Sequence, residues 1–214
     1  MSTLEALGYV KRDPQTKLYR PSLAVFKLGF VVLDSLEVRQ LADPYLKNVA
    51  KITGETINLV VLDEFEVVYI DRVPSSRPVA AHRAIGARLP VYCTSTGKAL
   101  LAYLPADDLA AVLDKIEWTK YTETTLTTPE ALQNELEQVR RQGFATSDCE
   151  MIPELRAVAA PIYQSSGQVV AAVNISVPAH RVTFDDLVQR LAPLTVTTAR
   201  QISEALGYGK NIQD

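Results

Sequence analysis

The segment YCTSTGKALLAYL, residues 92–104, contains residue types that suggest three kinds of chemistry. A Gly-Lys pair resembles the end of a phosphate-binding loop, a cysteine precedes it, and three hydroxyl-bearing residues lie between. A phosphate-binding loop of that type needs a glycine five residues before Gly97 and a Ser or Thr after the lysine. Tyr92 and Ala99 occupy these positions instead. The segment therefore does not predict nucleotide hydrolysis.

A reactive thiol is the second possibility. Cys93 lies close to the start of a predicted helix, where the helix dipole lowers a thiol pKa. The sequence places no His or Asp in a signature that would activate it. A small buried cysteine is the more common explanation. Pairing of Cys93 with Cys149, the second cysteine of the chain, as a redox couple stays open.

Anion binding is the third possibility. Thr94, Ser95 and Thr96 stand at the start of a predicted helix that includes Gly97. The first N–H groups of a helix have no partners within it, and the helix dipole favours a negative charge there. Ser and Thr are also the ordinary N-capping residues. The segment is thus either a plain cap or part of a carboxylate-binding site.

Polar residues within apolar strands are further candidates for a ligand site. In VNISV, residues 173–177, the alternation of a strand places Asn174 and Ser176 on one face. Asp148 lies in SDCE, beside another predicted strand. Such residues often face a pocket, although an outward, solvent-facing pair is an equal alternative.

Composition limits the class of protein. The chain has 214 residues, 47% of them hydrophobic and 22% charged, as in globular proteins. No apolar run reaches the roughly 18 residues that cross a bilayer, and the first residues lack a signal-peptide pattern. We therefore expect a cytoplasmic protein without a membrane partner. His82 and His180 stand apart from each other and from the cysteines, so no metal site or cofactor is predicted.

Charge is unevenly distributed along the chain. The net charge is −3, yet residues 1–27 hold five basic side chains against two acidic ones. The stretch YVKRDPQTKLYRP predicts strand, turn and strand, a wing-like hairpin whose cations reach DNA phosphates. The candidate DNA-binding residues are Lys11, Arg12, Lys17 and Arg20.

The remaining pattern predicts helices and strands in separate groups, hence an α+β fold with an antiparallel sheet flanked by helices. Helices are expected over 22–36, with Ser22 as N-cap, and over 37–53, with a break near Pro44. Another is capped by Thr127 or Thr128, and Thr127 with Glu130 fits a capping box. The last, 184–207, has Pro193 as a possible kink. Two hairpins are expected, one that pairs TINLVVLD with FEVVYIDRV and one that pairs RAVAAPIYQ with QVVAAVNISVP. Residues 76–91 are expected to be irregular.

Four stretches of the chain together resemble the IclR family of bacterial transcriptional regulators. They are LEALGYVKRDPQTKLYRPSLAVFKLG, RLPVYCTSTGKALLAYLP, LTTPEALQNELEQVRRQGFATSDCE and LRAVAAPIYQSSGQVVAAVNISVPAHRV. Their order and spacing cover nearly the whole chain. The resemblance implies a winged helix-turn-helix, a linker helix and a GAF-like, profilin-like effector-binding domain. Carried over to this chain, these parts are residues 1–21, as the end of the recognition helix and the wing, then 22–36 and 37–214.

The resemblance also implies a function, a site and partners. Such regulators are not enzymes. They bind a small organic or aromatic acid, which changes their affinity for operator DNA, and they form homodimers or homotetramers. The implied pocket adds Ser147, Cys149, Leu155 and Ala157 to the candidates already named. The complete candidate site is then Ser95, Thr96, Gly97, Ser147, Asp148, Cys149, Leu155, Ala157, Asn174 and Ser176.

Two other functions stay open. One is a GAF-type thiol reductase that uses Cys93 and Cys149, and the other is a dimerisation module without a ligand cavity. The chain departs from the family pattern in beginning inside the last helix before the wing. We therefore expect these 214 residues by themselves to bind DNA weakly and without sequence specificity.

Overall fold

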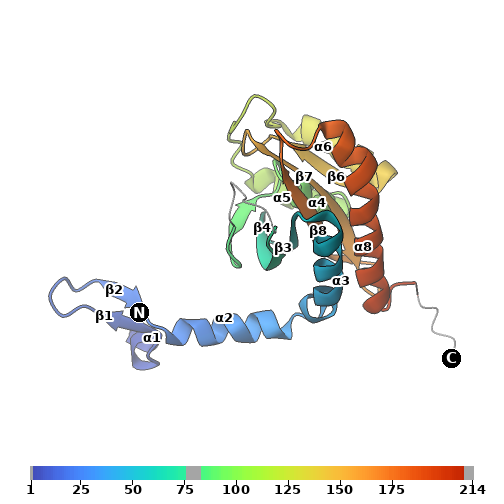
Figure 1. Ribbon diagram of the computed structural model, residues 1–214. Coiled ribbons are helices and arrows are strands. Elements are labelled where there is room, and N and C mark those ends of the chain that lie inside the picture. The colour runs from blue at the N-terminus through green and yellow to red at the C-terminus, as the bar shows by residue number, and fades with distance from the viewer. Residues whose placement is uncertain (1, 76–82, 210–214) are drawn as a thin grey trace. The chain divides into compact units, whose positions relative to one another are not determined.

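The computed structural model describes residues 2–75 and 83–209 (Figure 1). The chain divides into two compact units, Met1–Gln40 and Leu41–Asp214. The expected division into residues 1–21, 22–36 and 37–214 stays a prediction.

The strands form two antiparallel sheets. The first unit holds a two-stranded ribbon, and the second holds a six-stranded sheet in the order β5-β4-β3-β8-β7-β6. The strands are β1 Val10–Arg12, β2 Tyr19–Pro21, β3 Thr56–Asp63, β4 Glu66–Val73, β5 Arg88–Pro90, β6 Ala145–Asp148, β7 Leu155–Tyr163 and β8 Val169–Pro178. The predicted α+β fold and both predicted pairs of strands are confirmed.

Helices account for most of the remaining chain. They are α1 Ser2–Ala6, α2 Ala24–Ser35, α3 Glu37–Thr53, α4 Ser95–Leu101, α5 Ala106–Lys115, α6 Pro129–Gln142, α7 Phe184–Asp186, η1 Leu187–Leu191 and α8 Ala192–Ala205. In the second unit, α4 and α8 pack on opposite faces of the sheet (Figure 1).

The first unit contains the predicted hairpin. Asp13 shapes its turn by accepting hydrogen bonds from the backbone N–H groups of Gln15, at 2.8 Å, and Thr16, at 2.9 Å. These bonds hold the pKa of the Asp13 carboxyl below its usual range. Lys17 takes a left-handed conformation with φ 60°, which the turn requires.

Helix α2 begins later than the sequence suggests. Its N-cap is Leu23, not Ser22. Ser22 Oγ instead accepts a hydrogen bond from Ala24 N–H at 3.1 Å and donates one to the carbonyl of Gly8 at 2.5 Å. The serine therefore connects the start of α2 to the turn that follows α1.

The expected break at Pro44 is wrong, because α3 is continuous through it. A proline removes one helical hydrogen bond. The amphipathic face that surrounds it compensates, since packing supplies most of the stability of a helix in a protein. The buried residues of that face are Val38, Ala42, Leu46 and Val49.

The structure also decides three smaller expectations. Of the two threonines expected as the cap of α6, it is Thr128, and its hydroxyl accepts from Ala131 N–H at 3.2 Å. The segment 76–91, expected to be irregular, contains β5; residues 76–82 lie outside the described residues. The predicted helix 184–207 is interrupted by a π-helical turn, η1, just before Pro193, which has no N–H to donate.

The main core lies between the sheet, α4 and α6. Strand alternation directs one set of side chains toward α4, including Val60, Ala145 and Ala159. From α6, three buried apolar residues at helical spacing complete this core: Leu132, Leu136 and Val139. The core fixes the start of α4 against the middle of the sheet.

Candidate functional site

A cavity of about 50 Å³ lies where the start of α4 meets the sheet. Its floor follows from the strand register. Thr56 pairs with Ser176, Ser176 with Ala157, and Ala157 with Ser147, so four strands place small or polar side chains in one row. All four line the cavity.

A second row carries the amide groups. Asn58 on β3 pairs with Asn174 on β8 and, on its other side, with Arg72 on β4. Asn58 Nδ2 donates to Asn174 Oδ1 at 2.7 Å, and Asn174 Nδ2 donates to Ser176 Oγ at 3.1 Å. In the described part of the chain, the buried Asn58 Oδ1 has no hydrogen-bond partner.

The start of α4 forms the opposite wall. Thr94 is its N-cap, and Thr94 Oγ1 accepts from Gly97 N–H at 3.2 Å. The plain-capping interpretation is thus correct for Thr94. Ser95 and Thr96 are different, because their hydroxyls are buried against the cavity without a partner among the described residues.

Gly97 explains how α4 comes so close to the preceding segment. A Cβ atom at this position would lie 2.1 Å from the carbonyl oxygen of Val91 and 2.4 Å from its Cα. Only a glycine fits there, because the obstacle is backbone. Gly97 therefore positions the two hydroxyls without lining the cavity itself.

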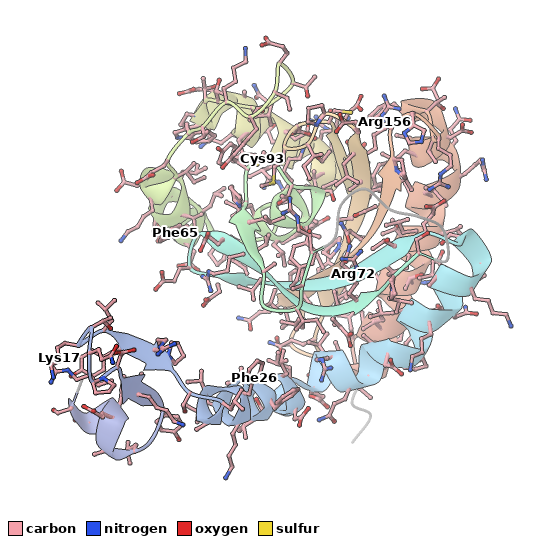
Figure 2. The ribbon with its side chains drawn as sticks, turned by 60° about the vertical axis from the view of Figure 1, so that its left-hand side comes forward. Lys17, Phe26, Phe65, Arg72, Cys93 and Arg156 are labelled. Atoms are coloured by element: carbon pink, nitrogen blue, oxygen red, sulfur yellow. The ribbon has the colours of Figure 1, made fainter. Side chains whose placement is uncertain are left out.

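Two arginines and a tyrosine line one side of the cavity. Arg72 lies on β4 (Figure 2), and its Nη1 donates to the carbonyl of Arg83 at 2.7 Å. Tyr69 lines the same cavity. Burial lowers the pKa of Arg72 and raises the pKa of Tyr69. A guanidinium still carries its charge at neutral pH, so this side of the cavity favours an anion.

The structure brings seven of the ten candidate ligand-binding residues together. Those that line the cavity are Ser95, Thr96, Ser147, Leu155, Ala157, Asn174 and Ser176. Gly97, Asp148 and Cys149 are not among its lining residues. Asp148 instead pairs with Arg156 Nε at 2.6 Å, and Arg156 also donates to the carbonyls of Ala179 and Val182.

Eight lining residues were not foreseen: the polar or charged Thr56, Asn58, Tyr69, Arg72 and Arg83, and the apolar Leu89, Met151 and Ile152. The first two carry a signal that the sequence contains. Thr56 and Asn58 interrupt a β-branched, apolar run at a spacing of two, which is the same pattern that singled out Asn174 and Ser176.

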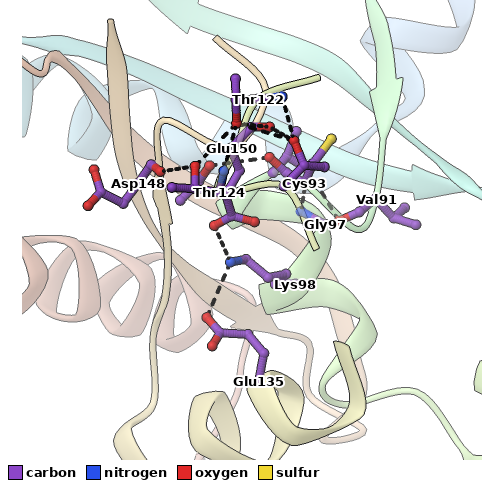
Figure 3. A network of polar contacts seen from close by, with 12 residues as sticks. Val91, Cys93, Gly97, Lys98, Thr122, Thr124, Glu135, Asp148 and Glu150 are labelled. Carbon is purple, nitrogen blue, oxygen red and sulfur yellow. Dashed lines mark hydrogen bonds and ion pairs between the residues drawn. The ribbon is translucent and has the colours of Figure 1, made fainter. Parts of the chain in front are cut away.

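Beneath the cavity, Lys98 lies buried between two carboxylates (Figure 3). Its Nζ is 2.7 Å from Glu150 Oε1 and 3.2 Å from Glu135 Oε1, and its side chain is 1% exposed. Burial raises the pKa of Glu150, while Lys98 acts in the opposite direction. The backbone carbonyl of Glu150 accepts from the hydroxyls of Thr122 and Thr125. Lys98 therefore ties α4 to α6 and to the loop after β6.

The cysteines do not form a reactive pair. Burial raises the pKa of Cys93 to about 12, and it also raises the pKa of Cys149. Both are free thiols, and Cys93 is buried. Because the thiolate is the nucleophile, this environment opposes thiol chemistry at neutral pH.

The candidate DNA-binding residues lie on the hairpin of the first unit. Lys11, Arg12 and Arg20 lie on its strands, and Lys17 lies in its turn (Figure 2). The Arg12 guanidinium lies 5.6 Å from the centre of the Tyr19 ring. Arg20 pairs with Asp13 at 2.9 Å while remaining largely exposed.

Within residues 2–75 and 83–209, no group of three or more His, Cys, Asp or Glu side chains is arranged to hold a metal ion. His82 lies outside these residues. In the same ranges, every helix is too short or too polar to cross a lipid bilayer.

The comparison with known families decides the identity of this arrangement. The family profile described as "Bacterial transcriptional regulator IclR C-terminal" matches residues 30–204. The chain belongs to the IclR family. It is 36% identical over 208 residues to the HTH-type transcriptional regulator KdgR of Escherichia coli K12, covering 97% of this chain and 79% of that protein.

Solved structures of IclR-family regulators agree with this assignment. The IclR protein of Thermotoga maritima has a TM-score of 0.82 at 33% identity, covering 97% of this chain and 83% of that one. A double mutant of the inducer-binding domain of the transcription factor PobR from Acinetobacter, in complex with 3-hydroxybenzoic acid, has a TM-score of 0.71 at 30% identity, covering 77% of this chain and 96% of that one. The fold class, the family and the function as an effector-responsive transcriptional regulator are thereby confirmed, and the thiol-reductase alternative finds no support.

Proposed function

We propose that this IclR-family chain senses a small carboxylate, which binds in the cavity between the start of α4 and the sheet. The observation that carries the proposal is the pair of unpartnered hydroxyls on Ser95 and Thr96. A buried polar group without a partner costs roughly 1–3 kcal/mol. A bound carboxylate accepts hydrogen bonds from both hydroxyls and recovers this cost.

The charge of the cavity supports the same ligand. Arg72 and Arg83 line it, and no Asp or Glu side chain of the described residues is among its lining residues. The amides at the first turn of α4 add positive potential beside the hydroxyls. The presence of a polar cavity also counts against a pure dimerisation module, for which no such space is expected.

The ligand-binding residues are testable by thermal unfolding. We expect a short carboxylic acid to raise the melting temperature of the chain, with a stabilisation of about 2.7 kcal/mol at a concentration of 100 times its Kd. The double variant Ser95→Ala, Thr96→Val is expected to lose this shift, because it removes both hydroxyls.

Ser166→Ala is the matched control, since Ser166 lies in the exposed turn between β7 and β8. This variant is expected to respond to the acid like the unchanged chain. An unchanged shift in the double variant, or no shift across a broad library of small acids, contradicts the proposal.

Operator DNA is the proposed second partner, and the cytoplasm, where that DNA lies, is the proposed location. Lys11, Arg12, Lys17 and Arg20 supply cations on an exposed hairpin. Such cations contact phosphates and position a protein without reading sequence. Ligand binding in the second unit is proposed to modulate this contact.

Self-association through α2 is also proposed. Phe26, Phe30, Val31 and Val32 are each more than half exposed within the first unit. Phe26 is labelled on α2 in Figure 2. The Phe26 and Phe30 rings stack on each other at 6.4 Å. A helix that is apolar on all sides is normally buried, which favours a homodimer or homotetramer in which α2 meets a second copy.

The variant Phe26→Asp, Phe30→Asp tests this contact. We expect it to lower the oligomeric state measured by sedimentation, because the two carboxylates cannot be buried unpaired. The control is Phe65→Asp, on the exposed turn between β3 and β4. If the Phe26→Asp, Phe30→Asp variant keeps the oligomeric state of the unmodified chain, as the control is expected to do, α2 is not the contact.

A further inference from the structure

The orientation of the hydrogen bonds between the side-chain amides of Asn58 on β3 and Asn174 on β8 restricts which ligand fits. Asn58 Nδ2 donates to Asn174 Oδ1 at 2.7 Å and to Ser176 Oγ at 3.5 Å, which uses both of its hydrogens. The carbonyl oxygen of the same side chain, Oδ1, is then left over. Asn58 is 3% exposed and lines the cavity, and no partner for Oδ1 exists among the described residues.

An unpartnered amide oxygen is an acceptor only, so its partner must supply a hydrogen. An ionised carboxylate has none, and neither does a ketone. The partner that satisfies Asn58 Oδ1 therefore carries an O–H or N–H group. A neutral hydroxyl suits a cavity lined by Arg72 and Arg83 better than a cationic ammonium does. A hydroxyl both donates and accepts, and those of Ser95 and Thr96 donate when a carboxylate occupies the site proposed above. The two walls of the cavity then meet different groups of the ligand.

The volume limits the size of the molecule that carries both groups. A cavity of about 50 Å³ holds the equivalent of roughly three to five water molecules. An engineered cavity that holds benzene measures roughly 150 Å³, about three times this volume. A carboxylate with one or two further carbons and a hydroxyl matches the smaller space.

We propose that the ligand is a short aliphatic hydroxy acid, whose carboxylate meets Ser95 and Thr96 and whose hydroxyl donates to Asn58 Oδ1. This inference rests on the proposed function, because it takes the cavity to be the carboxylate site. It adds Asn58 as the residue that selects the hydroxyl.

Titration calorimetry with three acids of matched length tests the selection on the unmodified 214-residue chain. Lactate carries a hydroxyl, pyruvate a carbonyl, and propionate neither. We expect lactate to bind roughly tenfold more tightly than either of the others, since only lactate satisfies the buried acceptor. We expect 3-hydroxybenzoate, which is too large, to bind more weakly than lactate.

The variant Asn58→Leu is expected to remove the preference, so that lactate and propionate bind alike. Asn134→Leu is the matched control, because Asn134 is exposed on α6, and it should keep the preference. The comparison of the three acids on the unmodified chain needs no variant, so it stands even where Asn58→Leu does not fold.

The outcomes separate this inference from the proposed function. Equal binding of lactate and propionate overturns the role of Asn58 but leaves the carboxylate site intact. Tighter binding of pyruvate overturns it as well, since Asn58 would then present Nδ2 to the cavity. Tighter binding of 3-hydroxybenzoate overturns the size limit. If none of the acids binds, both proposals fail.

Discussion

Replacing Lys98 by Met should lower the free energy of unfolding of the second unit by about 3–5 kcal/mol. Lys98 and Glu150 are almost fully buried, with side chains 1% and 8% exposed. Methionine preserves the volume but leaves the carboxylate of Glu150 buried without a cation. Breaking one side of a buried ion pair is costly because the remaining charge stays desolvated.

Urea denaturation followed by the fluorescence of Trp118 measures this loss. Trp118 is the single tryptophan of the chain; it is partly buried against the main core, and its ring centre lies 5.0 Å from that of the buried Tyr92. Lys120→Met is the matched control, because Lys120 pairs with Glu123 at the surface, where an ion pair contributes at most about 1 kcal/mol. Similar losses in both variants contradict the structural role given to Lys98.

Glu150→Gln should lower the free energy of unfolding by less than Lys98→Met does. It should also change how this free energy depends on pH. Burial raises the pKa of Glu150 above its ordinary value of 4.5. Between 4.5 and the raised value, the folded chain holds a proton that the unfolded chain has released, so stability falls as pH rises through that window. Glutamine does not titrate, so the free energy of unfolding of the variant should not show this decrease with rising pH.

Gly97→Ala is expected to have the second large effect, a loss of at least about 1–3 kcal/mol of stability together with weaker ligand binding. The added methyl group would overlap the backbone of Val91, with its carbonyl oxygen 2.1 Å away. Relief requires a shift of α4, which moves Ser95 and Thr96 away from their places in the cavity.

Gly29→Ala makes the same chemical change as Gly97→Ala but is expected to have the opposite effect on stability. Gly29 lies within α2, and a Cβ there would meet no atom within 4 Å in the chain. Alanine is the better helix former by roughly 0.8–1.0 kcal/mol, so this variant should be neutral or stabilising in the chain as described. Thermal unfolding and titration of both variants measure the contrast. A stable Gly97→Ala variant that binds normally shows that the close approach is not required.

Much of this fold was predictable because local patterns coincide with tertiary packing. The hairpin of β3 and β4 has β-branched strands, and α6 has an N-cap threonine, a first-turn proline and Gly143 at its end with φ 81°. Pro44 misled the prediction, because propensity predicts a break whereas a buried helical face overrides it. Strand β5 spans three residues, too short for any periodicity to register.

The site was less predictable, because its parts meet only through sheet register. Asn174 and Ser176 stand out in their own strand, but their partners on β3 are more than a hundred residues away. Asp148 shows the reverse error: a carboxylate beside a strand suggested the pocket, yet its charge is satisfied by Arg156. Lys98 belongs to the Gly-Lys pair that suggested a phosphate-binding loop, yet its ammonium is buried between two carboxylates outside the cavity.

The most direct measurement is the crystal structure of the chain grown with lactate. We predict electron density for the ligand within the cavity, with its carboxylate oxygens at hydrogen-bond distance from Ser95 Oγ and Thr96 Oγ1. Density for lactate only at other places, with side chains or water alone filling this cavity, would contradict the central claim.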